Sequence, residues 1–99
     1  MNIFDVKKIN KTKEIVEILK KNENVRIEKI ISTGQTTDWM EQEEEEFVML
    51  IQGEAIIEYE NKTQELRAGD TVIIKKNEKH RVVYTSKNPC CIWICIFYE

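Results

Sequence analysis

The chain has few of the residues that keep a polypeptide unfolded or repetitive. Three glycines and one proline in 99 residues exclude collagen-like repeats, long linkers and low-complexity tails. No apolar stretch approaches the roughly 20 residues that a membrane-spanning helix needs. Basic residues number 15 and acidic residues 18, so the net charge is −3 and the basic surface that binds nucleic acid is lacking. We therefore expect neither nucleic acid nor a membrane as a partner.

Cysteine is also scarce, and its placement argues against disulfides. The three cysteines are Cys90, Cys91 and Cys95, and an odd number within one short segment does not make a disulfide framework. Adjacent cysteines rarely pair, because the bridge between them is strained. The first residues show no charged region followed by an apolar one, so no signal peptide is expected. These features indicate free thiols in a reducing, cytoplasmic environment.

A short amphipathic helix is predicted near the N-terminus. Four apolar residues follow the i, i+1, i+3, i+4 spacing of one helical face: Ile15, Val16, Ile18 and Leu19. Thr12 can cap the N-terminus of such a helix. We expect a helix over about residues 12–21, within an N-terminal extension of about residues 1–24, packed on the outside of the remaining fold.

From residue 25 onward, short apolar segments alternate with turn residues. The segments with strand character span residues 25–27, 47–51, 55–59, 63–67, 71–74, 80–85 and 91–98. About eight short antiparallel strands are typical of a β-sandwich or barrel. A closed barrel leaves no unpaired edges and encloses an interior. The sequence therefore predicts an all-β single domain over residues 1–99, with a barrel over about residues 25–99 and a pocket inside it.

The segment between Gly34 and Gly53 resembles the first motif of the cupin family. Gly34, Glu46 and Gly53 keep the spacing of the glycine, glutamate and glycine of that motif. Met40 and Gln42 stand where cupins have two histidines. The resemblance therefore implies a site at the cupin position that lacks the two histidines of the first motif.

The segment between Gly69 and Tyr84 resembles the second cupin motif. Gly69 and His80 keep its spacing, whereas its proline, glycine and asparagine are replaced by Lys75, Asn77 and Tyr84. The resemblance to cupins covers about residues 30–98. The resemblance implies a small jelly-roll barrel with an interior site. It does not imply a reaction, because cupins carry many activities on one barrel.

Further segments resemble a subgroup of small single-domain cupins with glutamine in place of a metal-ligand histidine. These segments are Arg26-Ile27-Glu28-Lys29-Ile30, Trp39-Met40-Glu41-Gln42, Glu46-Phe47-Val48 and His80-Arg81-Val82. The subgroup is largely without an assigned reaction. The resemblance therefore implies a fold and a site, and no substrate.

The candidate site combines an amide, a carboxylate and an imidazole. Residues i and i+2 of a strand face the same way, so Met40 and Gln42 share a face. In cupins that face is the barrel interior, where the resemblance also places Glu46 and His80. Gln42, Glu46 and His80 would suit one divalent ion such as Zn, Fe, Ni or Mn. The alternative is a pocket without metal, in which Glu46 and His80 hydrogen-bond each other.

Five other side chains are candidates for the wall of this pocket: Met40, Trp39, Tyr84, Trp93 and Cys95. Cys95 is a possible fourth ligand, although a buried cysteine more often packs as a small apolar group. Two functions remain open. The chain is a barrel that binds a small molecule, with or without a metal ion, or it is a metal-dependent enzyme of the oxygenase or isomerase type that uses Gln42, Glu46 and His80.

The last predicted strand is apolar on both faces. Cys91, Trp93, Cys95 and Phe97 alternate with Ile92, Ile94, Ile96 and Tyr98. One set can face the barrel interior, and the other then faces outward. Because large exposed apolar patches are uncommon on monomers, we expect a homodimer related by a two-fold axis.

Overall fold

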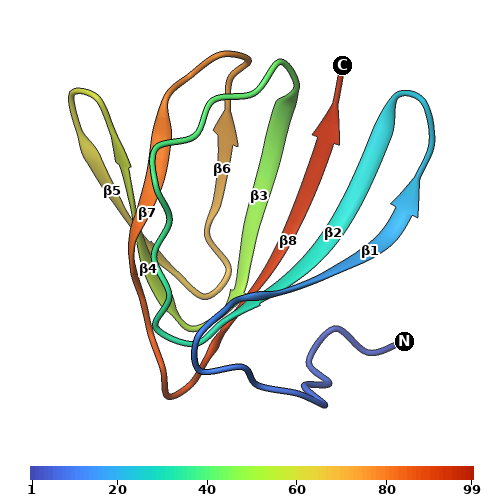
Figure 1. Cartoon of the computed structure of the whole chain (residues 1–99), viewed down its shortest axis with the longest axis vertical. Coiled ribbons are helices and arrows are strands. Elements are labelled where there is room, and N and C mark those ends of the chain that lie inside the picture. The colour runs from blue at the N-terminus through green and yellow to red at the C-terminus, as the bar shows by residue number, and fades with distance from the viewer.

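The computed structural model describes all 99 residues and contains eight β-strands and no helix (Figure 1). The strands are β1 (Ile15–Lys21), β2 (Val25–Ser32), β3 (Glu45–Gln52), β4 (Glu54–Tyr59), β5 (Thr63–Arg67), β6 (Thr71–Ile74), β7 (His80–Thr85) and β8 (Cys91–Tyr98). The chain therefore has no helix long and apolar enough to cross a lipid bilayer.

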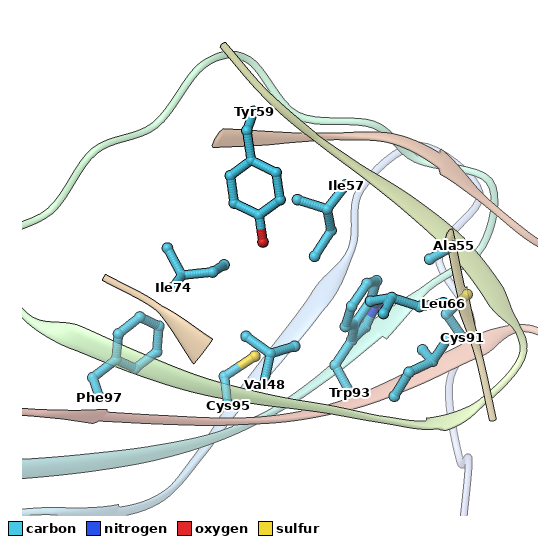
Figure 2. Packing of buried hydrophobic residues seen from close by; sticks show 11 residues of the cluster. Val48, Ala55, Ile57, Tyr59, Leu66, Ile74, Cys91, Trp93, Cys95 and Phe97 are labelled. Carbon is cyan, nitrogen blue, oxygen red and sulfur yellow. The ribbon is translucent and has the colours of Figure 1, made fainter. Parts of the chain in front are cut away.

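The strands form two sheets that enclose one core. The larger sheet has the order β1-β2-β8-β3-β6 and the smaller one the order β5-β4-β7, with antiparallel pairing throughout. Figure 1 shows the two sheets as opposite walls. Side chains from both walls meet between them (Figure 2), in a cluster of eleven: Val48, Leu50, Ala55, Ile57, Tyr59, Leu66, Ile74, Cys91, Trp93, Cys95 and Phe97.

The register between β3 and β8 places the carboxylate of Glu46 in this core. Glu46 lies opposite Phe97, and Val48 lies opposite Cys95. Since side chains alternate between the faces of a strand, the register that buries Val48 and Phe97 also turns Glu46 inward. The Glu46 side chain lies in the interior although it is ionisable, with a residue exposure of only 7%.

The predicted N-terminal helix is wrong, because residues 15–21 form strand β1. This strand pairs with β2 from Ile15 opposite Ile31 to Lys21 opposite Arg26. The register shifts between Ile18 and Lys20, so one extra residue lies in β1 at this point. The resulting bulge breaks the alternation of apolar and polar residues and produces a spacing that imitates a helical face. Residues 15–21 thus belong to the larger sheet and not to an external extension.

Gly53 occupies the tight connection between β3 and β4, where the chain passes from one sheet to the other. Its φ of 93° lies in the left-handed region that side chains disfavour. A Cβ atom at this position would lie 2.8 Å from Oγ of Ser86 and 2.9 Å from Sγ of Cys91. The glycine of the first motif is therefore needed for backbone conformation and for close packing.

The outer face of the larger sheet is only partly covered by the N-terminal segment. The ammonium of Lys29 on β2 donates a hydrogen bond of 2.7 Å to the carbonyl of Asp5, which ties this part of the N-terminal segment to the sheet. Further along the sheet, Phe47 pairs with both Ile73 and Ile96 on the same outer face. Ile73 is 53% exposed. An apolar surface therefore remains uncovered over β3, β6 and β8.

We propose that this uncovered face contacts a second copy of the chain. Ile73→Lys places a charge in the apolar surface and should convert a dimer into a monomer, as measured by light scattering during size-exclusion chromatography at micromolar concentration. Val83→Lys is the matched control, because Val83 is exposed on the smaller sheet and its replacement should leave the dimer intact. Elution of the unmodified protein as a monomer would contradict the proposal.

Candidate functional site

A cavity of about 190 Å³ lies inside the barrel. Most of its wall is apolar and comes from both sheets, with Ile30, Val48 and Phe97 from the larger sheet and Ile57 and Val82 from the smaller. Its polar groups are Glu14, Glu28, Ser32, Thr37, Gln42, Glu46 and His80. A mostly apolar cavity with a few converging polar groups is the usual form of a small-molecule site.

One wall of the cavity is a segment that pairs with the edge of β7. The backbone N–H of Met40 donates to the carbonyl of His80 at 2.8 Å, and the N–H of His80 donates to the carbonyl of Met40 at 3.0 Å. Nearby, the N–H of Thr37 donates to the carbonyl of Val82 at 2.9 Å. These bonds fix the segment that carries Gln42 beside the strand that carries His80.

The turn before β7 orients the imidazole of His80. Asn77 has a φ of 62°, which asparagine tolerates better than most residues, and it stands where the second cupin motif has glycine. Its N–H donates to the carbonyl of Gln42 at 2.7 Å. The carbonyl of Glu78 lies 2.9 Å from Nδ1 of His80. Because a carbonyl can only accept, Nδ1 carries the proton of the neutral ring and the lone pair lies on Nε2.

The free imidazole nitrogen lies beside a carboxylate that has another partner. Nε2 of His80 is 4.0 Å from Oε1 of Glu46, which is too far for a hydrogen bond. The same oxygen accepts a hydrogen bond of 2.9 Å from the amide Nε2 of Gln42. Gln42, Glu46 and His80 therefore lie together, and the partner of Glu46 is Gln42 and not His80. Although His80 is only 2% exposed, its Nε2 has no hydrogen-bond partner, and the residue lines the cavity.

This arrangement does not fit a resident metal ion. No three His, Cys, Asp or Glu side chains gather closely enough to hold one, whereas catalytic zinc sites use three protein ligands. Gln42 directs its amide N–H group, which cannot ligate a metal, toward Glu46. Only one nitrogen and one carboxylate remain as ligands, and a third is gained only if the amide turns over.

Three of the five predicted wall residues line the cavity, namely Met40, Trp93 and Cys95. The indole N–H of Trp93 donates to Oγ of Ser32 at 3.1 Å. Burial raises the pKa of the Cys95 thiol well above its usual value, and the nearby Glu46 carboxylate raises it further. The thiol therefore stays protonated and is not a nucleophile at neutral pH.

The prediction that Trp39 and Tyr84 line the pocket is wrong, because both side chains lie outside the cavity. Trp39 is 44% exposed and stacks against the guanidinium of Arg81, 4.6 Å from the ring centroid. It lies on the opposite side of the segment from Met40, which lines the cavity although it is 38% exposed. Tyr84 is 47% exposed. The pairing of β4 with β7 shifts register between Val82 and Tyr84, and this bulge turns Tyr84 away from the face that Val82 shares with the cavity.

Two carboxylates of the cavity were missed by the sequence analysis. Glu28 shares the inner face of β2 with Ile30 and Ser32, and this alternation is the signal that could have found it. Glu14 immediately precedes β1 and lines the cavity. It was missed because the predicted helix placed residues 12–21 outside the barrel.

Comparisons with known proteins agree with this architecture. No curated protein matches the sequence. A crystal structure from Ralstonia eutropha, described as a candidate mannose-6-phosphate isomerase, is 28% identical, with a TM-score of 0.94 over 100% of this chain and 96% of that one. A cupin superfamily protein from Desulfitobacterium hafniense is 15% identical, with a TM-score of 0.82 over 92% of this chain and 82% of the other.

A protein of unknown function from Streptococcus pyogenes has the same fold at 13% identity, with a TM-score of 0.76 over 99% of this chain and 92% of the other. The glutamine-for-histidine subgroup is not tested by these comparisons and stays a prediction. The family model described as the cupin domain matches residues 28–97. Since this match spans most of the 99 residues, the chain belongs to the cupin domain family.

Proposed function

We propose that the protein is a cytoplasmic cupin that binds a small molecule inside its barrel. The observation that carries this proposal is the cavity of about 190 Å³, onto which the unpartnered Nε2 of the buried His80 opens. A cavity of about 150 Å³ holds a benzene-sized ligand in another protein. The ligand is therefore of roughly one-ring size.

The cavity offers two kinds of contact to such a ligand. The side chains of Ile30, Val48 and Ile57 present apolar surface, and burying the hydrocarbon part of a ligand there is favourable. At the polar end, Nε2 of His80 and the carboxylate of Glu46 can accept hydrogen bonds. The site therefore favours a ligand with an apolar body and a hydrogen-bond donor.

The activity attributed to the Ralstonia eutropha protein is not the one we propose. A sugar phosphate carries two negative charges near neutral pH, and sites for phosphate generally supply arginine or lysine. No arginine or lysine lines this cavity, whereas Glu14, Glu28 and Glu46 do. An anionic substrate would therefore meet negative charge without compensation.

A metal-dependent enzyme of the oxygenase or isomerase type is the second candidate. It is favoured by the bond between Nδ1 of His80 and the carbonyl of Glu78, because metal-bound histidines commonly have such a partner on the other ring nitrogen. In this candidate Gln42, Glu46 and His80 hold one Zn, Fe, Ni or Mn ion after the amide of Gln42 turns over. Without a metal, Glu46 and His80 remain the groups that could exchange protons with a ligand.

Filling the cavity should weaken ligand binding. Val82→Phe puts a ring into the cavity wall and should weaken the binding of benzyl alcohol at least about tenfold, since the probe competes with the new side chain for the same volume. Val83→Phe is the matched control, because Val83 is the exposed neighbour outside the cavity. Chemical-shift titration of the backbone amides measures binding and reports whether both variants stay folded.

The binding proposal is contradicted if benzyl alcohol fails to shift the amides around the cavity in the unmodified protein. It is also contradicted if folded Val82→Phe binds the probe as well as Val83→Phe does.

The effect of divalent ions on the Tm distinguishes the small-molecule binding protein from the metal-dependent enzyme. A ligand present at 100 times its dissociation constant stabilises the native state by about 2.7 kcal/mol, which raises the Tm of a domain of this size by on the order of 10 °C. We expect no such rise with Zn, Ni, Mn or Fe(II), because the unmodified site has two ligands. The double variant Met40→His/Gln42→His should show the rise, since it adds two imidazoles. A rise in the unmodified protein that His80→Ala removes would favour the metal-dependent enzyme.

A further inference from the structure

We propose that the ligand of this cavity is an organic cation, such as a primary or secondary amine, and that Glu14 selects it. This inference rests on the proposed small-molecule function and names the chemical class of the ligand. It involves a residue outside the segment that matches the cupin family model, since that segment begins at residue 28.

The cavity has carboxylates without basic partners. Of the three that line it, Glu28 is paired with Arg26, whose Nε lies 2.9 Å from the carboxylate. The same guanidinium also contacts Glu44 at 3.5 Å and stacks on the ring of Phe97. Glu14 and Glu46 form no ion pair with lysine or arginine. A bound cation would compensate these two charges.

Glu14 is held toward the cavity by a short chain of hydrogen bonds. The indole N–H of Trp93 donates to Oγ of Ser32 at 3.1 Å, and the hydroxyl of Ser32 donates to Oε2 of Glu14 at 3.4 Å. Ser32 is 1% exposed whereas Glu14 is exposed, so this contact lies at the rim of the cavity. The floor of the cavity therefore positions the carboxylate at its edge.

The environment of Glu14 opposes its negative charge in the empty cavity. Burial raises the pKa of this carboxyl, the hydrogen bond from Ser32 lowers it, and the nearby charge of Glu28 raises it again. A cationic ligand would offset both unfavourable effects, because it brings opposite charge and hydrogen-bond donors to the carboxylate.

An organic cation suits the cavity better than a metal ion does. The carboxylates are spread around the wall, and no three ligating side chains are gathered. The N–H groups of an ammonium can donate to Glu14 or to Glu46, and the lone pair on Nε2 of His80 is a further acceptor. The apolar wall then contacts the hydrocarbon part of the ligand. The structure thus favours an amine with on the order of six to ten non-hydrogen atoms.

Three probes of one size and different charge test this inference. Benzylamine is cationic, benzyl alcohol is neutral and benzoate is anionic at neutral pH. In amide chemical-shift titrations at low salt, benzylamine should bind about tenfold more tightly than benzyl alcohol, because hydrogen bonds between charged groups are stronger than neutral ones. Benzoate should not bind measurably.

Glu14→Gln should weaken benzylamine binding about fivefold and leave benzyl alcohol binding within about twofold, because it removes one charge at a partly exposed position. The matched control is Glu17→Gln, which makes the same change of charge on β1. Glu17 lies opposite Lys29 on the outer face, so its replacement should change neither affinity by more than about twofold.

The possible outcomes separate this inference from the proposed function. If benzyl alcohol or benzoate binds as tightly as benzylamine, the cationic class is overturned and small-molecule binding stands. If Glu17→Gln weakens benzylamine as much as Glu14→Gln does, the role of Glu14 is overturned, because net charge alone would explain the loss. If none of the three probes binds, the proposed function fails and this inference fails with it.

Discussion

The register of β8 between β2 and β3 is the constraint on which the cavity depends. This strand pairs along its whole length with β2 and along most of it with β3. Its alternation sends Trp93, Cys95 and Phe97 inward, and its two neighbours bring Glu28 and Glu46 to the same interior. A slip of β8 by one residue would turn Trp93, Cys95 and Phe97 outward. The packing of the core and the composition of the site are therefore consequences of one pairing.

The site combines groups that are costly to bury with groups that offset part of the cost. A carboxylate loses hydration when it enters a protein interior, and the amide of Gln42 restores one hydrogen bond to Glu46. The effect of this charge extends to Tyr59, whose pKa is raised first by burial and then by the charges of Glu78 and Glu46. Buried charges arranged in this way lower the stability of the fold, as is common at functional sites.

The motif spacing was sufficient to predict the barrel and to place Gln42, Glu46 and His80 near one another. The second cupin motif is incomplete, but its turn still forms. Asn77 adopts the positive φ that the glycine of the motif would adopt at this position. The family model confirms the resemblance.

The errors at residues 14–21 and at Tyr84 have a common physical cause. The bulge in β1 gave residues 15–19 a helix-like spacing, so the strand and the inward position of Glu14 were not predicted. The bulge in β7 turns Tyr84 outward. A bulge inserts one residue without a partner, so it shows only when the neighbouring strand and its register are known. Strict alternation read from one sequence cannot reveal it.

The state of the imidazole in the cavity tests the account most directly. His80 is the single histidine, so a nitrogen-15 correlation spectrum of the untagged, histidine-labelled protein reports on this ring alone. We predict that the neutral ring carries its proton on Nδ1, held by the carbonyl of Glu78, and that the signal of Nε2 shifts when benzylamine binds. A protonated Nε2 with an unprotonated Nδ1, or an Nε2 signal that does not respond to a bound ligand, would contradict the account.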